Sequence, residues 1–503
     1  MKLSGRAETC IVALAVALCG AGALLSAPTA ETAARTDGPA LHTVGPYRVY
    51  TDLTPPKLWE ATARLKHMAR LYQRQTAGFD GTLTGPLPVF LYSDQQDFQD
   101  ALDRRTPRSA GIYTGSELRA IIDTDVFSRE SIWHVIQHEG FHQVAHRVIA
   151  RPGVALPLWV NEGLAEYFGE ALWTGTRLVP GAIDAGGPYS KVPVRGGRAG
   201  RIRRRLAEDV FRPLDELMDM TAQQWRDDHD ATSNYDQVYA VVHYLIHGDG
   251  GRHHQAFARY VNDVARGRPN LATFKKHFGR SIELLDASWR QWWTDLPADP
   301  TTKIHAIVAA ETLANSLARS AQADSYASDD TLIKAARDGD LLVAPGRKTY
   351  MPTWVIRQAG AAAPQIGPWT LHRNDGRTVL SVTLANDMIV SAVIPAGRDG
   401  RTPPRVTIDI TPPPAPDARP AVDDGSPRPS SAGLGGTTTT PSPTSRPDAR
   451  GRPAASGRCR RPRRSAGPPR PRRGQRETPR YELPGPARGG RRASACPWPA
   501  TRR

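Results

Sequence analysis

Two histidines and a glutamate in one short stretch have the spacing of a zinc site. The stretch reads His138-Glu139-Gly140-Phe141-His142. Residues four apart share one face of a helix, so the two imidazoles can bind one ion. Glu139 follows the first histidine and can take a proton from a water that the metal polarises. The pattern predicts zinc (Zn²⁺) ligands at His138 and His142, with Glu139 as a catalytic general base.

Two further histidines continue the same register. His134 and His146 lie four residues before and after the pair, and only the middle pair has a glutamate after its first member. The outer two would be roughly 18 Å apart along a helix axis, so one ion cannot bind all four. We therefore expect His134 and His146 to pack or to support the ligands.

Two histidines leave a zinc ion short of a ligand, and a second predicted helix supplies candidates. This helix is expected from residue 157 to about residue 172, and Glu162 and Glu166 share one face of it. The simplest alternative makes both glutamates exposed helix charges. That alternative does not explain why they lie in an apolar helix directly after the HExxH helix.

The pattern His138-Glu139-x-x-His142 followed by Asn161-Glu162-Gly163 resembles the gluzincin metallopeptidases, which include thermolysin and the zinc aminopeptidases. The resemblance implies that Glu162, 20 residues past His142, is the third zinc ligand. It also implies that Glu166 holds a ligand histidine and fixes its ring.

The resemblance extends more weakly downstream and upstream. Residues 235–245 are similar to the aminopeptidase helix whose leading tyrosine stabilises the oxyanion, which makes Tyr235 the candidate donor. Tyr239 or His243 could supply this polar group instead, and a purely structural Tyr235 is equally open. Upstream, residues 118–122 are expected to form the antiparallel edge strand that holds an extended substrate.

The chain also departs from two better-known groups. The aminopeptidase segment Gly-x-Met-Glu-Asn is absent, which favours an endopeptidase, and Ala145 occupies the place of the metzincin glycine. The whole pattern most resembles the little-characterised bacterial peptidase MA-like group, over residues 44–293 at most.

The expected fold is α+β and zincin-like, with a small mixed sheet, the HExxH helix and then a helical subdomain. Strands are expected at residues 88–92, at 112–113 and at 118–122, and Ser128 is expected to cap a helix that runs to about residue 149. Residues 186–205 read as a glycine-rich basic loop with solvated arginines at 201–205. Residues 305–338 look helical, and residues 354–394 look like a small β unit with a hairpin turn at Asn374-Asp375-Gly376.

The positive charge belongs almost wholly to the end of the chain. Of a net charge of +16 over 503 residues, residues 451–503 carry +14, from 16 arginines and two glutamates, which leaves +2 for the first 450. All four cysteines (Cys10, Cys19, Cys459 and Cys496) lie near the chain ends. A thiol nucleophile, a disulfide framework and a cysteine zinc cluster are therefore excluded between residues 20 and 458.

The N-terminus has the order of a secretory signal peptide. Lys2 and Arg6 precede an apolar run over residues 10–25, and small residues follow. The run is short for a membrane span, so we favour a cleaved signal over an uncleaved anchor and expect no transmembrane helix in the mature chain. The expected organisation is a signal peptide (1–30), a gluzincin-like metallopeptidase domain (31–300), a small helical and β unit (301–410) and a disordered Pro/Arg-rich tail (411–503).

The sequence thus predicts a secreted or extracytoplasmic zinc peptidase that acts on peptides or proteins. One alternative is a zinc-binding scaffold on a peptidase fold without turnover. Another is a binder of anionic cell-surface polymer through the tail, since sequence-specific nucleic-acid recognition is disfavoured by the scarcity of aromatic residues there. The lysine-free tail is also what an out-of-frame reading of GC-rich DNA would give.

Overall fold

The computed structural model describes residues 39–413, except for residues 77–85, 103–109, 123–127, 192–194, 280, 299, 321, 344–349, 375 and 397–404. The predicted signal peptide and residues 414–503 of the predicted tail lie outside the described residues. The protein is a mixed α+β structure, and the described residues belong to one compact unit. None of the helices in these ranges is both long enough and apolar enough to cross a membrane.

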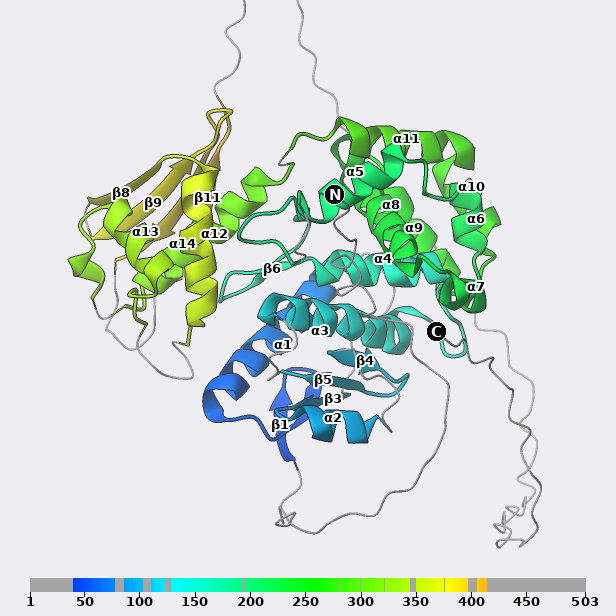
Figure 1. The fold of residues 1–503 in the computed structure, drawn as a ribbon, viewed down its shortest axis with the longest axis horizontal. Coiled ribbons are helices and arrows are strands. Elements are labelled where there is room, and N and C mark those ends of the chain that lie inside the picture. The colour runs from blue at the N-terminus through cyan, green and yellow to red at the C-terminus, as the bar shows by residue number, and fades with distance from the viewer. Residues whose placement is uncertain are drawn as a thin grey trace, which may run out of the picture. The chain divides into compact units, whose positions relative to one another are not determined.

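A five-stranded mixed sheet opens the fold (Figure 1), with the strand order β1-β2-β3-β5-β4. The strands are β1 (Ala40–Val44), β2 (Tyr47–Thr51), β3 (Leu87–Tyr92), β4 (Gly111–Tyr113) and β5 (Leu118–Ile121). β3 pairs in parallel with β2 and with β5, while the β1–β2 and β4–β5 pairs are antiparallel. Every second residue of β3 is buried, as expected for a strand with one face on a core.

The prediction of the edge strand is wrong by one position in the sheet. Residues 118–121 form β5, which lies between β3 and β4, so the antiparallel edge strand is β4. The two strands and the turn between them are present as expected. Strand order depends on contacts with β3, which is distant in sequence, and the local pattern of β4 and β5 does not encode it.

Helices surround this sheet and carry the predicted site. α1 (Pro55–Gln75) and α2 (Gln95–Ala101) follow the second and third strands, and α3 (Arg129–Val144) packs on β4 and β5 (Figure 1). Ser128 caps α3 by accepting a hydrogen bond from the Ser131 amide, as the sequence predicts. α3 ends at Val144 and continues as a π-helical turn, η1 (Ala145–Ile149). α4 (Leu158–Gly169) then packs against α3.

The chain continues as a largely helical region. A two-stranded hairpin, β6 (Leu172–Trp173) and β7 (Leu178–Val179), follows α4. The helices are α5 (Gly197–Ala207), α6 (Leu214–Asp219), α7 (Ala222–Asp227), α8 (Ala231–Gly251), α9 (His254–Val264), α10 (Asn270–Phe278) and α11 (Ile282–Asp295). α8 packs along α4 and brings distant sequence to the predicted metal helices.

The expected basic loop is partly a helix, which is a second correction. Residues 197–207 form α5, which buries Ala199 and Ile202 against the main core. Arg201 and Arg205 are not solvated, because they form ion pairs with the buried Asp236 of α8, whereas Arg204 is exposed as expected. A sequence rich in glycine and arginine shows little apolar periodicity, so the tertiary partner of this helix decides its structure.

The C-terminal part has a core of its own. It contains α12 (Thr302–Leu317), the short 3₁₀ turn η2 (Ala323–Ser325), α13 (Asp329–Asp338), α14 (Thr353–Ile366) and an antiparallel sheet of β8 (Trp369–Asn374), β9 (Arg377–Thr383), β10 (Ile389–Ile394) and β11 (Thr407–Thr411). Apolar side chains from residues 306–394 form its core, apart from the main core, which lies within residues 44–293 and also includes Val355 of α14. Across the predicted hairpin turn, Asn374 pairs with Arg377 and Gly376 has a φ of 73°.

Residues 354–366 of the expected β unit are helical. They belong to α14, which starts after Pro352 and contains the alanine-rich run 359–363. Val355, Ile356 and Ala359 are among the residues buried along one face. High helix propensity and a single apolar face favour the helix over a strand here.

Candidate metal centre

The first helix of the site presents both predicted histidine ligands on one face. His138 and His142 lie in the middle and last turn of α3, and their Nε2 atoms are 3.0 Å apart. Their side chains are 8% and 13% exposed, which places the pair at the edge of the protein interior. The buried neighbours Ile136 and Phe141 hold this part of α3 in the core.

The second helix brings a carboxylate to the same point. The Oε2 atom of Glu162 on α4 is 3.4 Å from the Nε2 atoms of both His138 and His142. Ligand atoms at about 2.0–2.1 Å from a tetrahedral zinc ion are roughly 3.3 Å apart, so these separations suit one ion. The donor set of two imidazoles and one carboxylate also fits zinc chemistry, and the residues present can hold the predicted ion.

The electrostatic environment keeps the Glu162 carboxylate ionised, which favours the binding of a cation. Burial alone would raise the pKa of Glu162, but the charge of His142 and hydrogen bonds to both histidines lower it to about 2. Burial would lower the pKa of each histidine, yet Glu162 outweighs it and raises the pKa of His142, and Glu162 with Glu166 raises that of His138 well above its ordinary value. The anionic Glu162 carboxylate beside the two imidazoles can attract a cation to this point.

Glu166 lies behind His138, where the resemblance placed it. Its Oε1 atom accepts the Nδ1 proton of His138 at 3.1 Å, which leaves Nε2 to face Glu162. Burial would raise the pKa of Glu166, but the charge of Arg198 holds it well below its ordinary value. The carboxylate is thus ionised and fixes the tautomer and the ring plane of His138.

The side chain of Glu139, the predicted general base, extends from α3 to the edge strand β4. The Tyr113 amide of β4 donates a hydrogen bond of 2.8 Å to Oε2 of Glu139. This contact aims the carboxylate towards the strand that the sheet order identifies as the edge. No sequence motif points to this contact, because Tyr113 lies 26 residues before Glu139.

Tyr235 lies beside His138. Its ring centroid is 6.3 Å from that of His138, and Trp225 of α7 packs edge-on against it at 5.2 Å. Burial, with a further effect of the Glu162 charge, raises the pKa of Tyr235 well above its ordinary value, so the phenol keeps its proton. A neutral phenol at this place can donate to a developing oxyanion.

The two alternative donors are held away from the site by other contacts. The Tyr239 hydroxyl donates to the Ala182 carbonyl at 3.0 Å, and Nε2 of His243 lies 3.2 Å from the Gly181 carbonyl. Both side chains are buried. Tyr235 is the member of the predicted trio whose ring contacts a metal-site histidine.

The outer histidines of the register have different surroundings. His134 lies 3.6 Å from Glu166 and 3.7 Å from Glu170, which makes it a supporting group beside His138. His146 is in the π-helical turn η1, and its Nδ1 atom is 2.8 Å from the Tyr113 hydroxyl. His134 joins His138 and Glu166 in a second cluster of possible ligand atoms, but Arg198 contacts the Glu166 carboxylate there.

Several residues that position the site could not be found from sequence motifs. The buried Gln137 amide donates to three carbonyls at the end of α4 and in the next loop, those of Phe168, Gly169 and Ala171. Gly163 allows α4 to approach α8, since a Cβ there would be 2.5 Å from Val242 Cγ2 and 2.9 Å from the Val238 carbonyl oxygen. In the sequence, the glycine of the Asn161-Glu162-Gly163 order is the one feature that could have indicated the close approach of α4 to α8.

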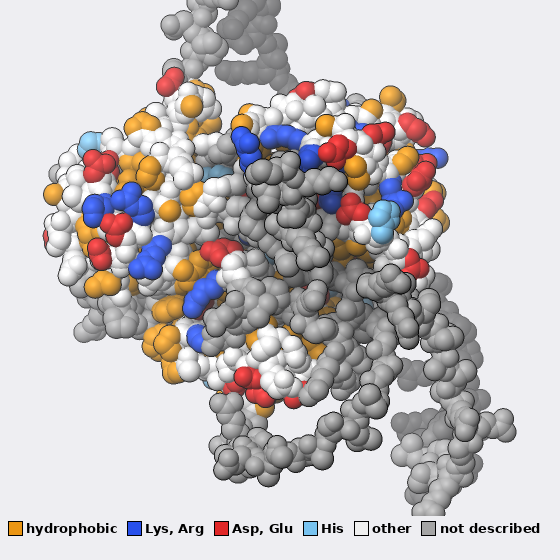
Figure 2. Space-filling model, in the orientation of Figure 1, with side chains coloured by type: hydrophobic (Ala, Val, Ile, Leu, Met, Phe, Trp, Pro, Cys, Tyr) orange, Lys and Arg blue, Asp and Glu red, His pale blue; other side chains and the backbone are white. Residues whose placement is uncertain are grey.

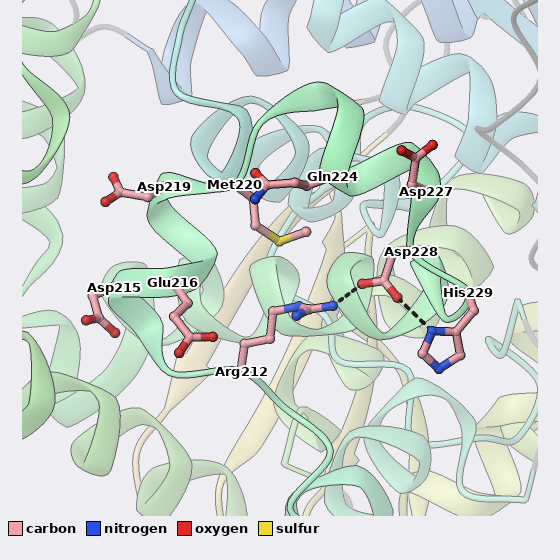
Figure 3. Close-up of a pocket in the computed structure, with 9 residues that line it drawn as sticks. All are labelled: Arg212, Asp215, Glu216, Asp219, Met220, Gln224, Asp227, Asp228 and His229. Carbon is pink, nitrogen blue, oxygen red and sulfur yellow. Dashed lines mark hydrogen bonds and ion pairs between the residues drawn. The ribbon is translucent and has the colours of Figure 1, made fainter.

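A pocket of about 640 Å³ lies elsewhere, over α6 and α7, and none of the predicted ligands lines it. Figure 2 shows acidic side chains gathered on the side of the molecule that carries α6, α10 and α11. In Figure 3, Asp228 lies between Arg212 and His229, while the carboxylates of Asp215 and Asp219 spread apart. Carboxylates that diverge into solvent do not form a metal centre.

One family model matches the part of the chain that contains the predicted site residues. A family model described as "Protein of unknown function (DUF1570)" matches residues 132–270. The matched range contains most of α3 and all of α4, α5 and α8, which carries Tyr235, and it ends before the C-terminal core. No curated protein and no solved structure gives a significant match to the chain.

Proposed function

We propose that the protein is a zinc-dependent peptidase of the gluzincin type, with a zincin-like arrangement of its sheet and metal helices. The observation that carries the proposal is the convergence of His138, His142 and Glu162 at separations of 3.0–3.4 Å, with Glu139 on the same helix. The three ligands leave a fourth position for water or substrate. A purely structural zinc site uses that position for a fourth protein ligand and has no need of a base.

Each residue has a defined task in the proposed hydrolysis. When bound, zinc supplies Lewis-acid polarisation of a water and of the scissile carbonyl. Glu139 takes the proton of the attacking water and passes it to the leaving amine. The Tyr235 phenol donates a hydrogen bond to the oxyanion, and Glu166 holds His138 in its binding tautomer.

The proposed substrate is a peptide or protein, and an internal cleavage site is favoured over N-terminal trimming. β4 is the edge strand of the sheet next to Glu139, and an extended peptide can add to such an edge by main-chain hydrogen bonds. Secretion through the N-terminal segment remains part of the proposal. Polymer binding by the arginine-rich tail stays a separate prediction.

The test compares the wild-type chain with Glu139→Gln. Both proteins are loaded with zinc, assayed for metal content and incubated with a peptide library whose products are read by mass spectrometry. We expect equal zinc content and a loss of hydrolysis of at least about 1000-fold in Glu139→Gln, because the base is removed and the ligands are not.

Glu130→Gln is the matched control, since Glu130 lies on the same helix nine residues before Glu139. It should cleave the library at the wild-type rate. Equal hydrolysis by Glu139→Gln and wild type would contradict the proposed mechanism. If all three proteins, the wild type included, bound zinc and none hydrolysed the library, the non-catalytic scaffold would be favoured.

A further inference from the structure

One arginine of α5 connects the metal helices to the Tyr235 helix. The Arg198 side chain is 4% exposed, and all three of its guanidinium nitrogens have hydrogen-bond partners. The charges of Glu166 and Asp236 outweigh burial and raise the pKa of Arg198 above its ordinary value. This arginine is therefore a fixed cation in the interior.

On one side, Arg198 holds the carboxylate that orients His138. Its Nη1 atom contacts the Glu166 carboxylate and lies 3.3 Å from Oε1 of Glu170, one turn further along α4. The other Glu166 oxygen accepts from Nδ1 of His138. A single carboxylate thus joins the guanidinium to a predicted zinc ligand.

On the other side, Arg198 holds the start of α8. Its Nη2 atom donates to the Tyr235 carbonyl at 2.9 Å, and its Nε atom donates to Asp236 at 3.0 Å. The guanidinium also lies over the Tyr239 ring, 4.2 Å from the centroid. The Arg198 guanidinium therefore contacts both the backbone of Tyr235, the candidate oxyanion donor, and the carboxylate that orients His138.

The local backbone is built to place this arginine. Gly196 and Gly197 have φ values of 76° and 59° at the start of α5, a region that favours glycine. A Cβ on Gly197 would be 2.1 Å from Asp184 Oδ1, so the helix start packs directly on the Asp184 loop. The Ala199 amide donates to the Asp184 carbonyl at 2.8 Å and fixes the first turn.

We propose that Arg198 is a positioning residue that couples the orientation of His138 to the position of Tyr235, an inference that rests on the proposed function. Arg198 is not needed merely to anchor α5 to α8. Arg201 and Arg205, on the same helix, also pair with Asp236 but have no described contact with Glu166 or with the Tyr235 carbonyl. Arg198 is the one of the three that reaches both parts of the site.

The experiment compares Arg198→Lys with Arg201→Lys in the full-length chain. Lysine keeps the charge but cannot bond to Glu166, Asp236 and the Tyr235 carbonyl in the planar geometry of a guanidinium. Zinc affinity is measured by chelator competition, and kcat and KM are measured with a peptide that the wild type cleaves. Urea unfolding confirms that each variant is folded.

For Arg198→Lys we expect zinc affinity to fall by about 10-fold or more, as for other groups that orient a metal-binding histidine. We also expect kcat to fall by about 10-fold with KM within about 2-fold, because the displaced groups act in the transition state. Arg201→Lys should stay within about 2-fold of wild type in all three quantities, because Arg201 has no described contact with Glu166 or with the Tyr235 carbonyl. In a Tyr235→Phe background, Arg198→Lys should lose less kcat than in the wild type.

Equal zinc affinity and equal kcat in the two lysine variants would overturn the inference. So would an Arg198→Lys effect on kcat that is the same with and without the Tyr235 hydroxyl. If Arg198→Lys does not fold, Arg198→Gln is measured in the same way, with Arg201→Gln as its control. A wild-type chain that binds no zinc would instead contradict the proposed function, so the two failures are distinguishable.

Discussion

The centre between α3 and α4 and the pocket over α6 and α7 both contain histidine and carboxylate side chains, yet they differ in burial and in partners. His138 and Glu162 are 8% and 13% exposed and face each other, whereas His229 of the pocket is 99% exposed. In the first region each charged side chain forms an ion pair or a hydrogen bond with a neighbour. In the second, most of the charges are solvated.

This difference shows what distinguishes a candidate site from a charged surface. Buried charges are costly unless they are paired and hydrogen-bonded, so their arrangement is fixed by the fold. Exposed charges contribute little and have no single geometry. Substitutions in the first region should therefore have large effects and the same substitutions in the second should have small ones.

The largest effect is expected at the carboxylate ligand. Glu162→Gln should weaken zinc binding on the order of 1000-fold, because it removes one charged ligand of three, and structural zinc sites bind with about 10–16 kcal/mol in total. Glu216→Gln, the same change in the pocket, should leave the affinity unchanged. Chelator competition measures both, and equal affinities would remove the distinction between the two regions.

The next effect concerns buried and exposed histidines and their pH dependence. Burial, with a further effect of the His247 charge, lowers the pKa of His243 to about 3. The His243 side chain takes up a proton near pH 6.5 in the unfolded chain but only near pH 3 in the folded chain. Its contribution to the free energy of unfolding is therefore fully present above pH 6.5 and is lost as the pH falls towards 3. His243 should account for a loss on the order of 3 kcal/mol between pH 7 and pH 4.

Urea unfolding of the metal-free protein across this pH range measures the effect. His243→Gln should lose less stability on acidification than the wild type, while His229→Gln in the pocket should follow the wild-type curve. Parallel curves for all three proteins would show that His243 is not held neutral in the folded state.

A smaller effect is expected from closer packing behind the metal ligand. Gly163→Ala places a methyl group against Val242 and the Val238 carbonyl of α8. Overpacking of this kind costs about 1–3 kcal/mol of unfolding free energy. Adding Val242→Ala relieves one of the two contacts and should recover part of the loss. A stable Gly163→Ala chain would mean that α4 and α8 are not in close contact.

The smallest effect is expected in the pocket itself. The double variant Asp215→Asn with Asp219→Asn should change the free energy of unfolding by less than about 0.5 kcal/mol, because both side chains are exposed. Thermal unfolding at low and high salt measures it. A larger loss would indicate that the pocket carboxylates have structural partners.

The sequence predicted the parts of the site that follow helical periodicity. His138 and His142 lie on one face of α3, Ser128 caps that helix, and Glu162 meets them from α4. These features depend on residues three or four apart, on a local cap and on one resemblance. The structure brings the predicted groups together, while zinc binding and hydrolysis remain predictions.

The sequence did not predict the contacts that cross between distant elements. Arg198 was read as part of a loop, because no local pattern shows that Glu166 and Asp236 will neutralise it. The three residues of β4 do not identify it as the edge strand, since its place depends on the pairing of β5 with β3. α14 was assigned to a β unit because its first aromatic and branched residues resemble a strand.

The central claim is that one zinc ion binds between α3 and α4. The most direct measurement is an anomalous difference map at the zinc absorption edge, from crystals of the full-length protein grown with zinc. We predict a single strong peak about 2.0–2.2 Å from Nε2 of His138, Nε2 of His142 and a Glu162 oxygen. A map without a peak there, or with its only peak beside Asp228 and His229, would contradict the claim.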